Sequence, residues 1–206
     1  MKRSLLTALF GLFLAAPAFA SSLVDGDGDA GKGKSITCAA CHGAAGNSIN
    51  PEWPSLAGQN AKYIVAQLYA FREGHRNNVL MTSQAMILDE DGINDLAVYY
   101  EGLAPEQLSV ADPALVERGR KLYIAGDGEQ QVSACIACHG PGGKGNPASA
   151  YPKIGGQHAT YTAKSLRDYA SGERRSADGN QIMNNIASGL SEDDIVALAS
   201  YIQGLY

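Results

Sequence analysis

The chain of 206 residues contains one pattern twice, and this internal repeat restricts the possible fold more than any other feature. A Cys-x-x-Cys-His-Gly unit begins at Cys38 and again at Cys135. The sequence that follows each unit also repeats, so that residues 53–59 align with residues 151–157. Because equivalent residues recur at a nearly fixed spacing, duplication of one domain is the simplest explanation.

The first twenty residues have the layout of a secretory leader. Two basic residues, Lys2 and Arg3, precede an apolar run at positions 5–16, and small residues lead up to Ala20. We expect cleavage after Ala20 and export to the periplasm. A retained membrane anchor is the alternative, but the apolar run is shorter than the roughly 20 residues that cross a bilayer.

The rest of the chain is long enough for two small domains. We predict a leader at 1–20, an N-terminal domain at 21–111 that includes a linker, and a C-terminal domain at 112–206. The linker assignment rests on the polar, proline-containing stretch 104–113, which lacks helical periodicity. Because domains of this size bury only a modest part of their surface, a large apolar cofactor inside each would help to stabilise them.

Each repeat is predicted to be helical, so the expected fold class is all-α. The middle helix should run from about residue 60 to 73 in the first repeat and from 158 to 171 in the second. The last helix has an N-cap candidate, Asp89 or Ser191, followed by acidic residues that suit the helix dipole. A glycine in the first helix would let it cross the last helix closely. No alternating run is long enough to predict a sheet.

Acidic residues outnumber basic ones, 21 to 16. Loss of the leader removes two bases, which leaves a formal net charge of −7 and argues against nucleic acid as a partner. The charge is uneven, because residues 21–111 carry 11 acids and 5 bases, while residues 112–206 carry 10 acids and 9 bases. We therefore expect the N-terminal half to be attracted to basic surfaces.

All the cysteines belong to the two repeated units, and each pair is followed at once by a histidine. The cysteines are Cys38, Cys41, Cys135 and Cys138. In such a unit the two thiols bond to the vinyl groups of a haem, and the adjacent histidine, here His42 or His139, reaches the iron. We therefore predict two covalent haem c groups. A zinc site, a disulfide framework and a thiol–disulfide oxidoreductase are weaker alternatives, because none requires this duplicated pattern in a helical chain.

Two methionines also recur in the repeat. Met81 and Met183 each stand seven residues before the leucine that introduces the last helix. We predict that they ligate the two irons opposite His42 and His139. A thioether in that position favours ferrous iron and fills the site that a peroxide or gas would need.

The other candidate ligands have no counterpart in the alignment. His75 aligns with a glutamate and His158 with an asparagine. Met86 is unmatched too, and we expect it to fill a gap in a core.

Pro54 and Pro152 open a repeated Pro-x-Leu/Ile-x-Gly element. The carbonyl before this turn could accept the second ring N–H of His42 or His139 and so fix the imidazole. A rigid turn without that contact is an equal alternative. Four further repeat-matched residues could bind haem carboxylates or have ordinary capping and core roles. They are Gln59, Gln157, Tyr63 and Tyr161.

In this order and in duplicate, the motifs resemble class I cytochromes c, and the whole mature chain resembles the dihaem cytochrome c4 family. The resemblance rests on the two Cys-x-x-Cys-His-Gly units, on Pro-x-Leu-Ala-Gly-Gln and Pro-x-Ile-Gly-Gly-Gln, and on the closing Ser-Tyr-Ile-Gln-Gly-Leu. It implies two tandem cytochrome c folds related by a pseudo-two-fold axis, with haem carboxylate edges meeting between them and His/Met ligands on both irons.

The resemblance also implies a role in a respiratory chain. The expected donor is a quinol:cytochrome c reductase and the expected acceptor a terminal haem-copper oxidase, often with loose attachment to the membrane. The two halves differ in two spacings. Gly33 lies closer in sequence to Cys38 than Gly119 lies to Cys135, and the spacing from histidine to methionine is five residues longer in the second half. We therefore expect two unequal haem potentials.

The leading hypothesis is an electron carrier that is not an enzyme. A dihaem peroxidase is the rival, but such an enzyme needs an exchangeable sixth ligand and usually a longer chain. A non-catalytic subunit of a respiratory complex is a third hypothesis, which differs from the first only in its partner.

Overall fold

The computed structural model describes residues 22–176 and 178–206, so the predicted leader at 1–20 lies outside the described residues. Regular structure in this part of the chain is helical, and extended segments pair only in isolated bridges. The all-α prediction is therefore confirmed. Across the described ranges, no helix has both the length and the apolar character that a membrane span would need.

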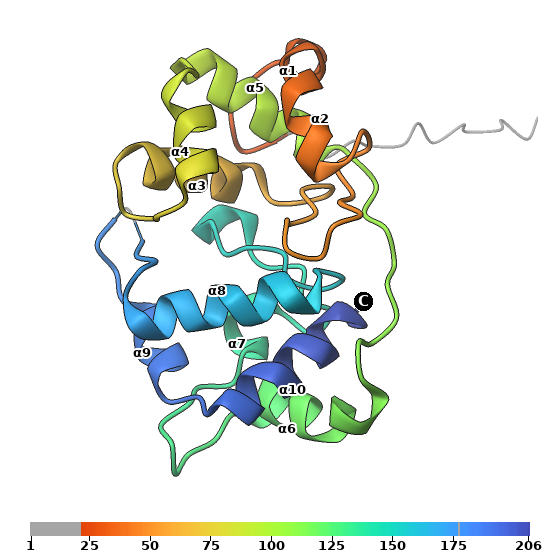
Figure 1. The fold of residues 1–206 in the computed structure, drawn as a ribbon, viewed down its shortest axis with the longest axis vertical. Coiled ribbons are helices and arrows are strands. Elements are labelled where there is room, and N and C mark those ends of the chain that lie inside the picture. The colour runs from red at the N-terminus through yellow and green to blue at the C-terminus, as the bar shows by residue number, and fades with distance from the viewer. Residues whose placement is uncertain (1–21, 177) are drawn as a thin grey trace, which may run out of the picture.

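In the N-terminal domain the first helix crosses the last one, and the middle helix packs against the last one and against the helix before it. Helix α1 packs across α5, and α3 packs against α4 and α5 (Figure 1). The bounds of these helices are α1 Gly28–Lys34, α2 Ile36–His42, α3 Ala61–Arg72, α4 Val79–Met86 and α5 Glu90–Glu101.

The C-terminal domain repeats this arrangement. Helix α10 packs against α6 and α8, and α8 packs against α9, so α6 to α10 correspond in order to α1 to α5. Two short 3₁₀ helices are added. The bounds are η1 Pro113–Leu115, α6 Val116–Ala125, α7 Ile136–His139, η2 Pro147–Ser149, α8 Ala159–Ser171, α9 Ile182–Ser188 and α10 Glu192–Gln203.

Both last helices begin at the predicted caps. The Asp89 side chain accepts a hydrogen bond from the Gly92 amide at 2.8 Å. The Ser191 hydroxyl accepts one from the Asp194 amide at 3.2 Å, and the Asp194 carboxylate accepts the Ser191 amide in return, which completes a capping box. These local signals placed the helix starts correctly.

Glycines make the close helix crossings in both domains. A Cβ added at Gly31 would lie 2.1 Å from the Asp95 carbonyl oxygen, and one added at Gly119 would lie 2.2 Å from the Ala197 carbonyl oxygen. Since no ordinary side chain fits at such distances, the first helix of each domain can approach the last one only through glycine. The sequence prediction of a close crossing is confirmed at both positions.

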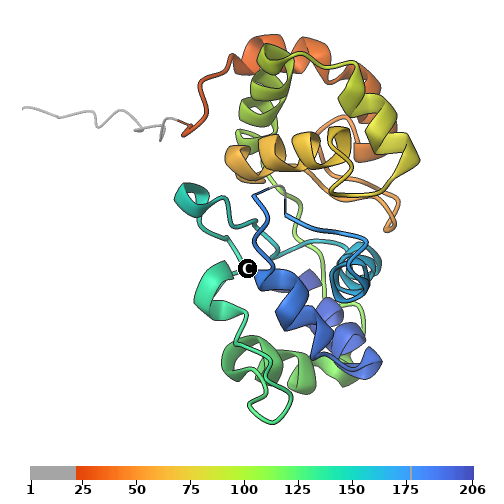
Figure 2. The same ribbon diagram turned by 90° about the vertical axis from the view of Figure 1, so that its left-hand side faces the viewer.

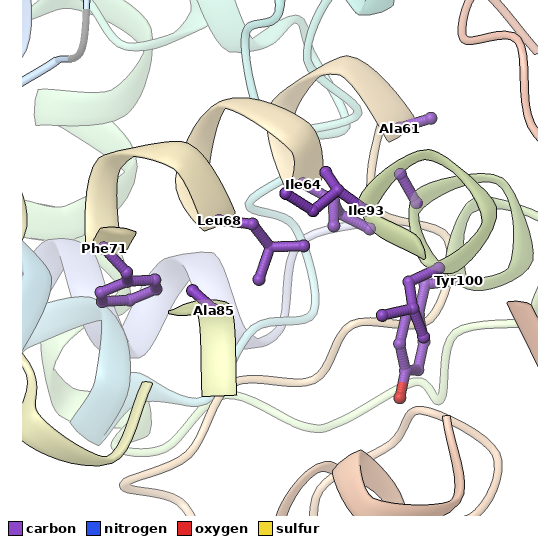
Figure 3. Packing of buried hydrophobic residues seen from close by; sticks show 9 residues of the cluster. Ala61, Ile64, Leu68, Phe71, Ala85, Ile93 and Tyr100 are labelled. Atoms are coloured by element: carbon purple, nitrogen blue, oxygen red, sulfur yellow. The ribbon is translucent and has the colours of Figure 1, made fainter. Parts of the chain in front are cut away.

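The hydrophobic core of the N-terminal domain lies where α3, α4 and α5 meet. Ile64, Leu68 and Phe71 extend from α3 toward Ala85 of α4 and Ile93 of α5 (Figure 3). Cys38 and Met81 pack against this cluster from its edge. The core therefore joins the Cys-His segment and the methionine helix.

The two domains are stacked along the long axis of the molecule, and the segment that joins them runs along one side (Figures 1 and 2). That segment is bound to the C-terminal domain, because Gln203 donates a hydrogen bond to the Ser109 carbonyl at 2.7 Å and Ser200 accepts one from the Asp112 amide at 2.7 Å.

The extra residues that precede Cys135 form a turn closed by the paired backbones of Asp127 and Val132.

Candidate haem sites

Each Cys-His unit lies on a short helix that ends directly after the histidine. On α2, Cys38, Cys41 and His42 are spaced i, i+3 and i+4, so they share one face. In the other domain Cys135 caps α7, which contains Cys138 and His139. All four cysteines are half-buried. The glycine after each histidine has a positive φ, +81° at Gly43 and +75° at Gly140, which turns the chain away and stops the helix.

Both histidine rings are oriented by a proline carbonyl. His42 Nδ1 lies 2.8 Å from the Pro54 oxygen, and His139 Nδ1 lies 3.0 Å from the Pro152 oxygen. The accepting oxygen belongs to the proline itself. Because a carbonyl can only accept, Nδ1 carries the proton and donates it in both rings.

This geometry leaves Nε2 of each ring with its lone pair free. Neither Nε2 atom forms a hydrogen bond to any residue in the described part of the chain. Burial lowers the pKa of His42 and of His139, against the opposing effect of the proline carbonyl, so both rings favour the neutral form. A neutral imidazole held through Nδ1 is the state that ligates a metal through Nε2.

The Cys135 thiol lacks the lowered pKa of a redox-active cysteine. Burial raises the pKa of Cys135 to about 11, whereas reactive cysteines have lowered values. Among the described residues, no three His, Cys, Asp or Glu side chains are grouped so as to hold a metal ion. The raised pKa of Cys135 is the opposite of what an oxidoreductase pair needs.

The two repeat-matched methionines occupy equivalent helices. Met81 lies in the first turn of α4, where the Asn78 side chain caps its amide at 2.9 Å, and Met183 lies in the first turn of α9. Both side chains are half-buried. Helix α9 is held in place by Asn184, which donates hydrogen bonds to the carbonyls of Tyr169 at 2.7 Å and Arg174 at 2.9 Å.

The unmatched candidates lie elsewhere. Met86 is 60% exposed at the end of α4, so the prediction that it fills a core gap is wrong. A single methionine carries no information about which side of its helix faces inward. His158 is buried between the domains, where its Nε2 lies 2.7 Å from the Ser48 carbonyl, and His75 is partly exposed near Glu73.

The repeat-matched glutamines bridge the domains. The Gln59 side chain donates to the Lys153 carbonyl and accepts from the Lys153 amide, both at 2.8 Å. The Gln157 side chain donates to the Ser55 carbonyl at 2.9 Å and accepts from the Ser55 amide at 3.0 Å. Both glutamines are buried. Each therefore clamps the residue that follows the histidine-binding proline of the opposite domain.

Two arginines at equivalent positions of the repeat, which the sequence analysis did not single out, also meet at the domain interface. Arg76 donates to the Tyr161 hydroxyl and Arg174 donates to the Tyr63 hydroxyl, so each arginine reaches into the other domain. Both guanidinium groups also donate to the Gln67 oxygen, at 2.8 and 2.7 Å. Their recurrence in the alignment was the one available signal.

No carboxylate in the described part of the chain forms an ion pair with Arg174. Arg174 is 3% exposed, and its Nε atom has no hydrogen-bond partner among the described residues. Although burial would raise the pKa of Tyr161, the charges of Arg76 and Arg174 outweigh that effect and lower it to about 8. A buried cation without an anion is costly, so this interface suits a negatively charged group.

These observations fit a haem c in each domain. Each domain offers two thiols and a free imidazole Nε2 next to one another, with a methionine on a second helix. The interface between the domains offers the buried Arg174 and the half-buried Arg76 as cationic donors for carboxylates. Tyr100, whose buried hydroxyl also lacks a partner within the described residues, lies in the core cluster that Cys38 contacts.

Comparison with known proteins points in the same direction. The family model described as Cytochrome c matches residues 30–103 and 116–206. The chain is 41% identical to a cytochrome c4 of Azotobacter vinelandii over the full length of both chains. It is 34% identical to a thiosulfate dehydrogenase electron acceptor of Thiomonas intermedia, over 98% of this chain and 90% of that one.

A solved structure is similar as well. The crystal structure of reduced recombinant cytochrome c4 from Pseudomonas stutzeri superposes with a TM-score of 0.84 and 42% sequence identity. The match covers 88% of this chain and 100% of that one.

Proposed function

This chain belongs to the cytochrome c4 family of dihaem cytochromes c, and from that premise we propose that it carries single electrons between respiratory proteins of a bacterial periplasm. It holds two haem c groups and acts as an electron carrier. A bound haem supplies an iron that alternates between the ferric and ferrous states, taking up and releasing one electron at a time.

The residues that would hold the two haems follow from the site. Cys38 and Cys41 in the first domain, and Cys135 and Cys138 in the second, supply the thiols for covalent attachment. His42 and His139 supply Nε2 to the irons. The carbonyls of Pro54 and Pro152 hold the proton of each imidazole at Nδ1, leave Nε2 unprotonated and fix the orientation of the ring.

We propose Met81 and Met183 as the sixth ligands. Their placement on the equivalent helices α4 and α9, both half-buried, supports this assignment. A methionine at both irons would keep exogenous ligands out and favour electron transfer over chemistry on a substrate. The unmatched His158 is engaged with the Ser48 carbonyl, which makes it a poor alternative ligand.

The observation that carries the proposal is the duplication of the histidine geometry. In both domains Nδ1 donates to a proline carbonyl while Nε2 stays free. A dihaem peroxidase would need one of its irons to open to peroxide. The equivalence of the two ligand sets favours two closed centres, and so a carrier rather than an enzyme.

The wider setting is proposed from the family and the leader. We place the domain boundary near Ala111, the leader cleavage after Ala20 and the mature protein in the periplasm, with loose membrane attachment. The donor would be a quinol:cytochrome c reductase and the acceptor a terminal haem-copper oxidase. The relative from Thiomonas intermedia, an electron acceptor of thiosulfate dehydrogenase, makes a dehydrogenase a second class of donor to test.

Ligation is tested by visible and near-infrared spectra of the purified holoprotein, oxidised and reduced. Methionine-ligated ferric haem has a weak near-infrared charge-transfer band. We expect Met81→His and Met183→His each to remove the contribution of one haem, while the double variant removes both.

Met86→His is the matched control, because Met86 lies on the same helix as Met81 but is exposed. It should leave the band unchanged. If Met81→His and Met183→His also leave it unchanged, the proposed sixth ligands are wrong. Turnover of hydrogen peroxide at enzymatic rates by the wild-type protein would favour the peroxidase instead.

A further inference from the structure

A continuous hydrogen-bonded path links the histidine of each domain to a glutamine of the other. The Pro54 carbonyl accepts the His42 Nδ1 proton at 2.8 Å, and the Ser55 amide donates to Gln157 Oε1 at 3.0 Å. The Pro54 carbonyl and the Ser55 amide are the two ends of one peptide group. One planar unit of the N-terminal domain therefore joins its histidine to a side chain of the C-terminal domain.

The second domain has the same path in the opposite direction. The Pro152 carbonyl accepts the His139 Nδ1 proton at 3.0 Å, and the Lys153 amide donates to Gln59 Oε1 at 2.8 Å. Again the carbonyl and the amide belong to one peptide group. The two paths use repeat-equivalent residues, so the interface contains the device twice.

The glutamines are held firmly in this geometry. Each also donates through Nε2 to the carbonyl of the residue that it accepts from. Each Oε1 accepts a second hydrogen bond from the amide that follows it in the chain, that of Asn60 at 3.0 Å or His158 at 3.1 Å. Because backbone amides can only donate, they identify Oε1 as the oxygen that faces them.

We propose that Gln157 and Gln59 are positioning residues that tune the histidine of the opposite domain, Gln157 acting on His42 and Gln59 on His139. The proposal rests on the proposed function, in which both histidines ligate haem iron. An acceptor at the peptide N–H polarises the group and makes its carbonyl oxygen a stronger acceptor. A stronger acceptor at Nδ1 makes the imidazole more basic and so stabilises ferric iron.

Removing the glutamine should therefore weaken the pull on Nδ1 and favour reduction of one haem. Gln157→Met, which keeps the length of the side chain but removes both polar atoms, should raise the potential of the N-terminal haem. We expect a change of about threefold to tenfold in its reduction equilibrium, which is about 28–59 mV for one electron. Gln59→Met should do the same to the C-terminal haem. The effect of each substitution thus falls on the domain that does not contain it.

The experiment is a spectroelectrochemical titration of the full-length holoprotein, with the two haems distinguished by repeating it in the Met81→His and Met183→His backgrounds. Proton NMR of the reduced protein gives an independent readout. The Nδ1 proton of His42 should move upfield in Gln157→Met, and that of His139 in Gln59→Met, as each hydrogen bond weakens.

Asn60→Ala is the control, because it removes a hydrogen bond between the domains, to the Tyr151 carbonyl at 2.6 Å, but leaves the hydrogen bonds of the Pro54–Ser55 and Pro152–Lys153 peptide groups in place. It should shift neither Nδ1 proton. Gln157→Glu is a second variant that keeps an oxygen acceptor for Ser55, and it should not raise the potential of the N-terminal haem.

An effect of each glutamine substitution on the haem of the opposite domain alone distinguishes tuning of the haem potential from a purely structural role of the glutamine. If Gln157→Met shifts the C-terminal haem, both haems equally or neither, with the charge-transfer bands intact, the inference is overturned. Loss of those bands in the wild-type protein would instead overturn the proposed function. A rise of the N-terminal potential in Gln157→Glu as large as that in Gln157→Met would also contradict the inference.

Discussion

Alanine at Gly31 is expected to destabilise the N-terminal domain, whereas alanine at Gly33, two residues along the same helix, should stabilise it. A Cβ at Gly31 would lie 2.1 Å from the Asp95 carbonyl oxygen and 2.8 Å from Tyr99 Cβ, while nothing lies within 4 Å of a Cβ at Gly33. Both glycines lie in α1. Both substitutions therefore gain helix propensity, and only one meets another helix.

The magnitude follows from the two opposing effects. To restore an ordinary contact, α1 must move away from α5 by more than about 1 Å, which strains the hydrogen bonds that Asp95 accepts from the Asp27 amide and the Lys34 ammonium. Such overpacking costs about 1–3 kcal/mol, and alanine recovers about 1 kcal/mol of helix propensity. We expect Gly31→Ala to lose up to about 2 kcal/mol and Gly33→Ala to gain about 0.5–1 kcal/mol.

Urea and thermal unfolding of the two full-length holoproteins, followed by far-ultraviolet circular dichroism, measure this difference. A gap of about 2 kcal/mol corresponds to a difference in Tm on the order of 10 °C for a domain of this size. If Gly31→Ala is as stable as Gly33→Ala, the close crossing of α1 and α5 does not require glycine, and the packing argument is refuted.

Two further predictions concern charged side chains. Arg174→Gln should weaken the domain interface by about 1.5–3 kcal/mol, because it removes charge-assisted hydrogen bonds to the other domain. Arg175→Gln, which changes an exposed side chain, should not weaken it. Limited proteolysis of the two variants measures the difference, and equal resistance would contradict the prediction. Burial would raise the pKa of Asp194, but hydrogen bonds from Ser191 and Arg118 hold it below its usual value. The stability that this carboxylate contributes is therefore full above its ordinary pKa and lost as pH falls through the lowered one. The free energy of unfolding should fall less steeply between about pH 6 and pH 2 in Arg118→Gln than in the wild-type protein. Identical slopes would refute the assignment.

Local signals in the sequence were enough to predict much of the fold. The caps at Asp89 and Ser191 and the middle helices at about 60–73 and 158–171 follow from neighbouring residues, and the structure places those middle helices at Ala61–Arg72 and Ala159–Ser171. The methionine helices were not predicted. They are short, and α9 depends on the distant backbone contacts of Asn184.

Some residues of the candidate sites could likewise be predicted from the sequence, and others could not. The haem attachment residues follow from spacing alone, because thiols and histidine must reach one haem together. The part played by Gln59 stayed open at the sequence level, because its partner Lys153 is 94 residues away and becomes a neighbour only when the domains stack. The same holds for Arg174, whose partner Tyr63 is 111 residues away.

The reciprocal glutamine clamps also give the interface a symmetry that a chain with two unrelated domains would lack. Gln59 contacts Lys153 while its counterpart Gln157 contacts Ser55, the counterpart of Lys153. This is the self-complementary pattern of a two-fold homodimer. A single-haem subunit with such a surface could pair with a copy of itself before any fusion, and the linker would then contribute mainly by raising the effective concentration of the second subunit.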